Sequence, residues 1–156
     1  MKMRVFILSE NAIIRLFFLF ILSGLFLNVR LEGQNLISDL HYTVSMKDPA
    51  NHLFQVEMEC RECNIDTIDF RMPQWMPGYY QIMNYWREVS DFYAMGNDGK
   101  TIMVNKMNDN TWRIISPGKD GFCIKYNVKA EKKFVANNFL DSTHGYIIPA
   151  ATFMYI

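Results

Sequence analysis

The sequence predicts an all-β domain, either an antiparallel β-sandwich or a strongly twisted sheet. Short segments with apolar residues at every second position recur along the chain, and clusters of glycine, proline, asparagine and aspartate separate them. Half of the 156 residues are hydrophobic and 15% are aromatic, which is enough to form a core. The clearest segment is residues 122–130, where an apolar face alternates with a polar one over nine residues.

Taken in order, the expected strands are residues 41–46, 53–59, 65–72, 101–104, 111–115 and 122–130. In the second of them Phe54, Val56 and Met58 share one face, and a glutamine and two glutamates share the other. We expect the third strand to form a hairpin with the second.

Residues 81–94 fit both a helical stripe and a strand, and we favour a short helical turn followed by a strand. The next four residues, 97–100, predict a hairpin turn because Asp-Gly adopts tight-turn conformations readily. Residues 147–156 are apolar to the end, and we expect a strand that pairs with a segment beyond it. On this basis we expect residues 34–156 to be a β domain that is incomplete at its C-terminus.

The first 33 residues predict an export signal. Two basic residues, Lys2 and Arg4, precede an apolar run at residues 16–27. A signal peptide needs about 7–15 such residues, whereas a membrane-spanning helix needs about 20. An uncleaved N-terminal anchor helix is the alternative. Either interpretation predicts an exported domain, periplasmic or anchored and facing out of the cytoplasm, with membrane contact through this segment alone.

Charge and cysteine content exclude several classes of function. Sixteen basic and sixteen acidic residues cancel, so no basic excess favours nucleic acid. Cys60 and Cys63 have C-x-x-C spacing, but a structural zinc site needs a second such pair. We interpret them as two thiols in a hairpin turn, which leaves a bond between them open after export.

No sequence motif supplies a catalytic residue or a metal ligand. The three histidines, His41, His52 and His144, match no zinc motif, and we expect the first two to be solvated and the third to lie in a polar turn. Glu57 and Glu59 could serve acid–base chemistry, but they fall on the polar face of a strand, which favours a solvated pair.

An aromatic turn is the strongest candidate site. It is the run Met72-Pro73-Gln74-Trp75-Met76-Pro77-Gly78-Tyr79-Tyr80. Pro77 suits the first corner of a tight turn and Gly78 the second. The surrounding rings either line a cleft or close one end of the sheet, and packing is slightly favoured.

This turn resembles the L-P-x-W-x-P-G-S-Y signature of the glycyl aminopeptidases, zinc metallopeptidase family sixty-one. Further matches follow in the family's order, at Thr111-Trp112, Tyr126-Asn127-Val128, Leu140-Asp141 and Phe153-Met154-Tyr155. The likeness runs from about His41 to the end of the chain. Two departures are Tyr79 in place of the signature serine, and Met83-Asn84 in place of an arginine and an acid.

The resemblance implies that this is the N-terminal domain of a larger exported metallo-aminopeptidase that lacks its catalytic domain here. The zinc, its ligands and the glutamate base would belong to that missing domain, so this chain by itself would be inert. Its partners would be the catalytic domain and a peptide substrate. Trp75, Pro77, Gly78, Tyr79 and Tyr80 would be the candidates for contact with the substrate cleft. The alternative is a stand-alone exported module that binds glycans or peptides through the same turn.

Overall fold

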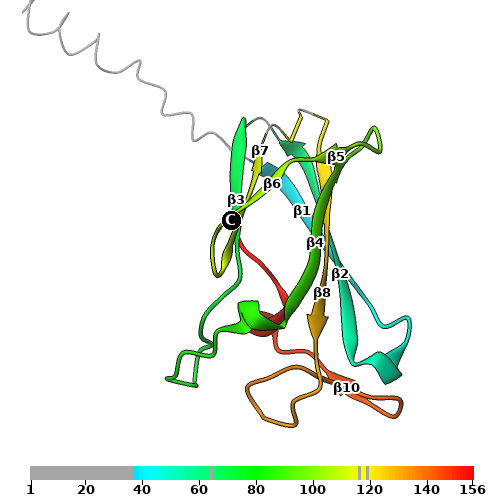
Figure 1. The fold of residues 1–156 in the computed structure, drawn as a ribbon, viewed down its shortest axis with the longest axis vertical. Helices are drawn as coiled ribbons and strands as arrows, with labels where there is room; N and C mark the ends of the chain where they lie inside the picture. Colours follow the sequence, from blue (N-terminus) through cyan, green and yellow to red (C-terminus); the bar gives the residue numbers. More distant parts are fainter. Residues whose placement is uncertain (1–36, 64, 116, 119) are drawn as a thin grey trace, which may run out of the picture. The chain divides into compact units, whose positions relative to one another are not determined.

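The computed structural model describes residues 37–63, 65–115, 117–118 and 120–156 (Figure 1). The elements within them are β1 (Ile37–Ser45), η1 (Pro49–Asn51), β2 (Leu53–Cys63), β3 (Thr67–Arg71), η2 (Tyr85–Glu88), β4 (Val89–Gly96), β5 (Thr101–Ile102), β6 (Val104–Asn108), β7 (Thr111–Ile115), β8 (Phe122–Lys129), β9 (Phe139–Leu140), β10 (Gly145–Tyr146) and α2 (Pro149–Thr152).

All strand pairs are antiparallel, which confirms the predicted all-β class. One sheet has the order β1-β2-β8-β4-β5, a second has the order β3-β7-β6, and β9 pairs with β10. The segment before β4 forms the expected short helical turn, η2. The expected strand 101–104 is instead two strands, since β5 pairs with β4 and β6 pairs with β7.

The two larger sheets contribute to one hydrophobic core. The face of β2 predicted to be apolar is buried, with Phe54, Val56 and Met58 at most 1% exposed. Two aromatic contacts join the sheets: the Phe70 and Phe122 ring centroids are 6.1 Å apart, and Phe92 stacks on Trp112 at 5.3 Å. Such contacts make the sheets interdependent, because each covers apolar surface of the other.

The expected hairpin between residues 53–59 and 65–72 is wrong. β2 has β1 on one side and β8 on the other, so neither of its edges is free. β3 therefore lies in the second sheet, where its residues pair with β7 from Thr67↔Ile115 to Arg71↔Thr111. The alternating apolar residues of β3, Ile68 and Phe70, are buried, but alternation carries no information about the partner strand.

Cys60 and Cys63 lie at the end of strand β2 and not in a hairpin turn. Both are buried free thiols, and the pairing of β2 with β1 continues without a shift as far as Cys63. Three residues along a strand separate two Cα atoms by about 10 Å. A disulfide spans at most about 7 Å, so the expected bond between these thiols does not fit the strand.

The apolar C-terminal segment does not form the predicted strand. Pro149–Thr152 is a single helical turn, α2, and Thr152 and Met154 are almost fully buried. The hydroxyl of Tyr126 donates to the Thr152 carbonyl at 2.8 Å, and Tyr155 pairs with Arg71 through two backbone hydrogen bonds of 2.7 and 3.0 Å. This segment is therefore packed on its own domain.

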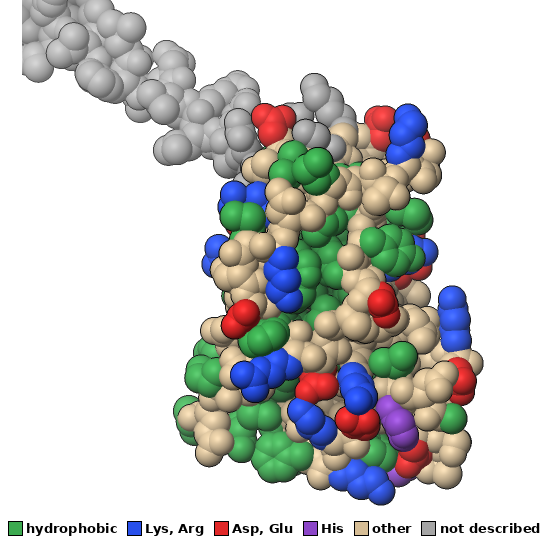
Figure 2. All heavy atoms as spheres, viewed as in Figure 1, with side chains coloured by type: hydrophobic (Ala, Val, Ile, Leu, Met, Phe, Trp, Pro, Cys, Tyr) green, Lys and Arg blue, Asp and Glu red, His purple; other side chains and the backbone are tan. Residues whose placement is uncertain are grey.

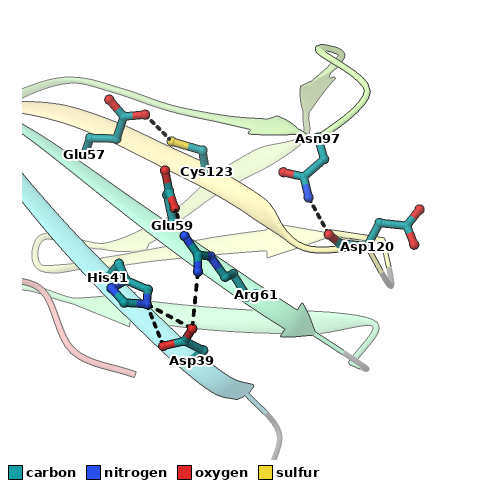
Figure 3. A network of polar contacts seen from close by, with 8 residues as sticks. All are labelled: Asp39, His41, Glu57, Glu59, Arg61, Asn97, Asp120 and Cys123. Atoms are coloured by element: carbon teal, nitrogen blue, oxygen red, sulfur yellow. Dashed lines mark hydrogen bonds and ion pairs between the residues drawn. The ribbon is translucent and has the colours of Figure 1, made fainter.

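The outer face of the five-stranded sheet carries paired charges (Figure 3). His41 contacts Asp39 at 2.9 Å, and Arg61 donates to Glu59 at 3.0 Å. His41 is exposed, as predicted. Pairs of this kind contribute little to stability because water screens them.

The predicted signal or anchor, residues 1–33, lies outside the described residues. Within the part of the chain that the structure describes, no helix is long and apolar enough to cross a membrane.

Candidate functional site

The aromatic turn projects from the segment that joins β3 to η2 (Figure 1). The Tyr79 amide donates to the Met76 carbonyl at 3.3 Å, which closes the turn predicted at Pro77-Gly78. Gly78 has φ +84°, a conformation that favours glycine. A Cβ at this position would meet no atom within 4 Å, so the backbone angle alone explains the glycine.

The rings of the turn differ in their exposure. Trp75 is 55% exposed and Tyr80 is 94% exposed, whereas Tyr85, just beyond the turn, is 2% exposed. Pro77 and Gly78 are exposed and Tyr79 is half-buried. The slight preference for packing is therefore wrong for Trp75 and Tyr80 and correct for Tyr85.

A second loop lies beside the turn, although nothing in the sequence pattern predicted it. The Tyr79 ring meets Phe134 edge-on, with centroids 5.6 Å apart, and the Tyr146 hydroxyl donates to the Phe134 carbonyl at 3.2 Å. This loop, residues 131–148, also exposes Val135 and Ile147, at 75% and 36%. We use the name apolar end for the exposed side chains of Trp75, Tyr80, Ile82, Val135 and Ile147.

Figure 2 shows hydrophobic side chains gathered at the lower left, where Figure 1 places the turn that follows β3. A cavity also lies within the neighbouring loop, residues 131–148. This cavity, of about 640 Å³, is lined by Lys133, Phe134, Val135, Phe139, His144, Tyr146 and Ile148. Soluble monomers rarely expose an extended apolar surface, and such surfaces usually mark an interface.

The base of the turn is closed by hydrogen bonds. The Met83 amide donates to the Gln74 carbonyl at 2.7 Å, which joins the two ends of the loop. The buried Tyr85 hydroxyl donates to the Ala136 carbonyl at 2.9 Å, so η2 is also tied to the second loop. The exposed rings therefore project from a base with defined geometry.

The titratable groups near the apolar end are engaged in local structure. One Asp141 carboxylate oxygen accepts from the Thr143 hydroxyl and from the Thr143 and His144 amides, which form the polar turn predicted around His144. These hydrogen bonds hold the pKa of Asp141 well below its usual value. Its carboxylate is thus a structural acceptor. His52 lies in a turn as expected but is half-buried, since its ring contacts the Leu140 carbonyl.

The two carboxylates singled out in the sequence, Glu57 and Glu59, lie on the outer face of the five-stranded sheet. Glu57 lies on the outer face of β2, where Lys125 contacts it at 3.0 Å and lowers its pKa. The Cys123 thiol donates to the same carboxylate at 3.2 Å, and burial raises the pKa of that thiol to about 12. In the described ranges no group of three or more His, Cys, Asp or Glu residues could hold a metal ion.

Comparison with known proteins supports the sequence resemblance. The model of the Peptidase M61 N-terminal domain matches residues 41–156. An aminopeptidase N family protein from Idiomarina loihiensis has a similar fold, with a TM-score of 0.69 and 23% identity over 74% of this chain. The match spans only 19% of that protein's length. No curated protein matches the chain. The matched family model covers most of the chain, and the chain therefore belongs to the family of Peptidase M61 N-terminal domains.

Proposed function

We propose that the chain is the non-catalytic N-terminal β domain, a β-sandwich, of an exported zinc metallopeptidase similar to glycyl aminopeptidases. It packs on a catalytic domain through the apolar end, and the aromatic turn lines one wall of the cleft that takes the peptide substrate. The observation that carries this proposal is the gathering of exposed apolar side chains on two adjacent loops at one end of the domain.

The family membership supports the partner. A domain that occurs at the N-terminus of peptidases has a catalytic domain as its natural neighbour. Burial of Trp75 and Tyr80 by such a partner would explain why these side chains are exposed in this domain alone. The described residues offer no set of zinc ligands. In this proposal the catalytic domain would hold the zinc, which would supply activation of water for attack on the peptide bond.

The division of roles follows from the chemistry of the site. The rings and the rigid turn can position a peptide and exclude water, and among them only the tyrosine hydroxyls could exchange a proton. Trp75, Gly78, Tyr79 and Tyr80 are consequently proposed as positioning groups, and Pro77 as the residue that fixes the turn. We propose none of them as a catalytic residue.

The first test is to read the source gene beyond the codon for Ile156. An open frame that continues into H-E-x-x-H with a later glutamate supports the proposal. If such a protein is found, Tyr80→Ala should lower its kcat/KM for glycyl peptides about tenfold or more, as loss of an interface anchor does. Tyr93→Ala is the matched control, because Tyr93 is 42% exposed on β4 and outside the apolar end.

The exposed Trp75 also suits the alternative, a module that binds glycans or peptides without a catalytic domain. In that case a glycan or peptide quenches tryptophan fluorescence of the chain, and Trp75→Ala abolishes the response. A stop codon after Ile156 together with such quenching would replace the peptidase proposal.

A further inference from the structure

We call the segment from the end of β3 to η2, which carries the aromatic turn, the aromatic loop. The β6–β7 hairpin contacts this loop at both of its ends. At the first end, the Met72 amide donates to the Asn110 carbonyl at 2.9 Å, and the Asn110 side-chain amide donates back to the Met72 carbonyl at 3.1 Å. Met72 is fully buried, so this reciprocal pair fixes where the loop leaves β3.

At the second end, one lysine bridges two tryptophans. The Lys106 ammonium lies 4.4 Å from the centroid of the Trp112 ring and 5.6 Å from that of Trp86. Trp112 is Lys106's direct partner across the β6–β7 pair and is 5% exposed. Trp86 belongs to η2, the turn in which the aromatic loop ends. An ammonium held by two indole faces attracts both through their negative π surfaces.

We infer that Lys106 is a positioning residue for the aromatic turn: its ammonium bridges Trp112 in the sheet and Trp86 in η2, and so fixes the base from which Trp75 and Tyr80 project. What the turn then contacts rests on the proposed function, but the bridge itself does not. The η2 segment is short and makes only one internal turn, so it depends on such outside contacts for its position.

The stack continues inward from Lys106. Phe92 stacks on Trp112 with ring planes 18° apart, and Tyr126 stacks on Phe92 with planes 21° apart. The lysine thus anchors η2 to rings that belong to both sheets. Lys106 is an exposed lysine on an edge strand, and such a lysine can also serve only to prevent sheet-to-sheet association. The experiment must separate these two roles.

The experiment is hydrogen–deuterium exchange on the full chain and on three variants. Lys106→Met keeps most of the apolar stem but removes the charge, Lys106→Arg keeps a cation that stacks on indoles, and Lys100→Met removes an exposed lysine of the β4–β5 turn. We expect Lys106→Met to speed exchange across residues 83–88 about two- to fivefold, as loss of one exposed cation–π contact does, with β8 unchanged. Lys106→Arg and Lys100→Met should leave those rates close to natural.

Two results would overturn the inference. The first is exchange across residues 83–88 in Lys106→Met at the same rate as in the natural chain, because local opening would then not depend on the ammonium. This holds even if the variant aggregates. The second is an equal rise in β8, which would show global destabilisation. Neither result depends on peptidase activity, so failure here is distinct from failure of the proposed function.

Discussion

Replacing Trp75 by alanine tests whether the aromatic turn supports the fold or serves a site. Truncating a fully buried aromatic side chain costs about 3–5 kcal/mol of unfolding free energy. Trp75 is 55% exposed, so less than half of that contact is made within this domain. We therefore expect Trp75→Ala to lower the unfolding free energy by about 1–2 kcal/mol.

The matched variant is Trp112→Ala. Trp112 is 5% exposed, stacks on Phe92 and holds the Lys106 ammonium, so its removal should cost the full amount of about 3–5 kcal/mol. Urea unfolding followed by far-ultraviolet circular dichroism measures both, and it does not rely on the tryptophans being replaced. A loss of 3 kcal/mol or more in Trp75→Ala would refute the reasoning, because it would place that ring in the core.

Further predictions concern a backbone position, one carboxylate, one thiol and one buried hydroxyl. Gly78→Ala should lower the unfolding free energy by about 1–2 kcal/mol, measured by urea unfolding, because φ is +84° while the added methyl meets no atom. The hydrogen bonds of Arg113 lower the pKa of Asp69, so stability from this pair is present above about pH 4 and declines as the pH falls below it. Asp69→Asn should reduce that decline in acid-unfolding curves, and an unchanged curve would contradict this assignment. Burial raises the pKa of Cys123 to about 12, so iodoacetamide at pH 8 should label this thiol quickly only after unfolding. Tyr126→Phe should cost about 1–3 kcal/mol, since it leaves a buried carbonyl without its donor, and a smaller loss would indicate that water replaces the hydroxyl.

Local sequence pattern predicted the strands better than their partners. The alternation of residues 122–130 gave β8 almost to its ends, and the Pro-Gly pair gave the position of the turn. Alternation fixes a buried face through the period of the strand, but pairing depends on which edges remain free. For that reason the pairing of β3 with β7 in the second sheet could not be predicted from the sequence.

The candidate site was predicted only in part. The turn residues were identified, but their exposure depends on what packs around them, and the sequence cannot show this. Phe134 and Val135 lie in a stretch without strand or helix pattern, so nothing marked the second loop as a neighbour of Tyr79. The C-terminal segment was misassigned because a buried helical turn and a buried strand are both continuous apolar runs.

The closed base of the aromatic loop bears on how this family can diversify. Because the Met83 amide meets the Gln74 carbonyl, the backbone leaves and rejoins the domain at one place, and Tyr79 adds a side-chain contact to Phe134. Segments of other lengths and compositions can be grafted between these two residues while the sheets keep their pairing, since longer surface loops add little closure entropy. The domain is therefore a scaffold on which this one loop can change in length and composition while the two sheets stay the same.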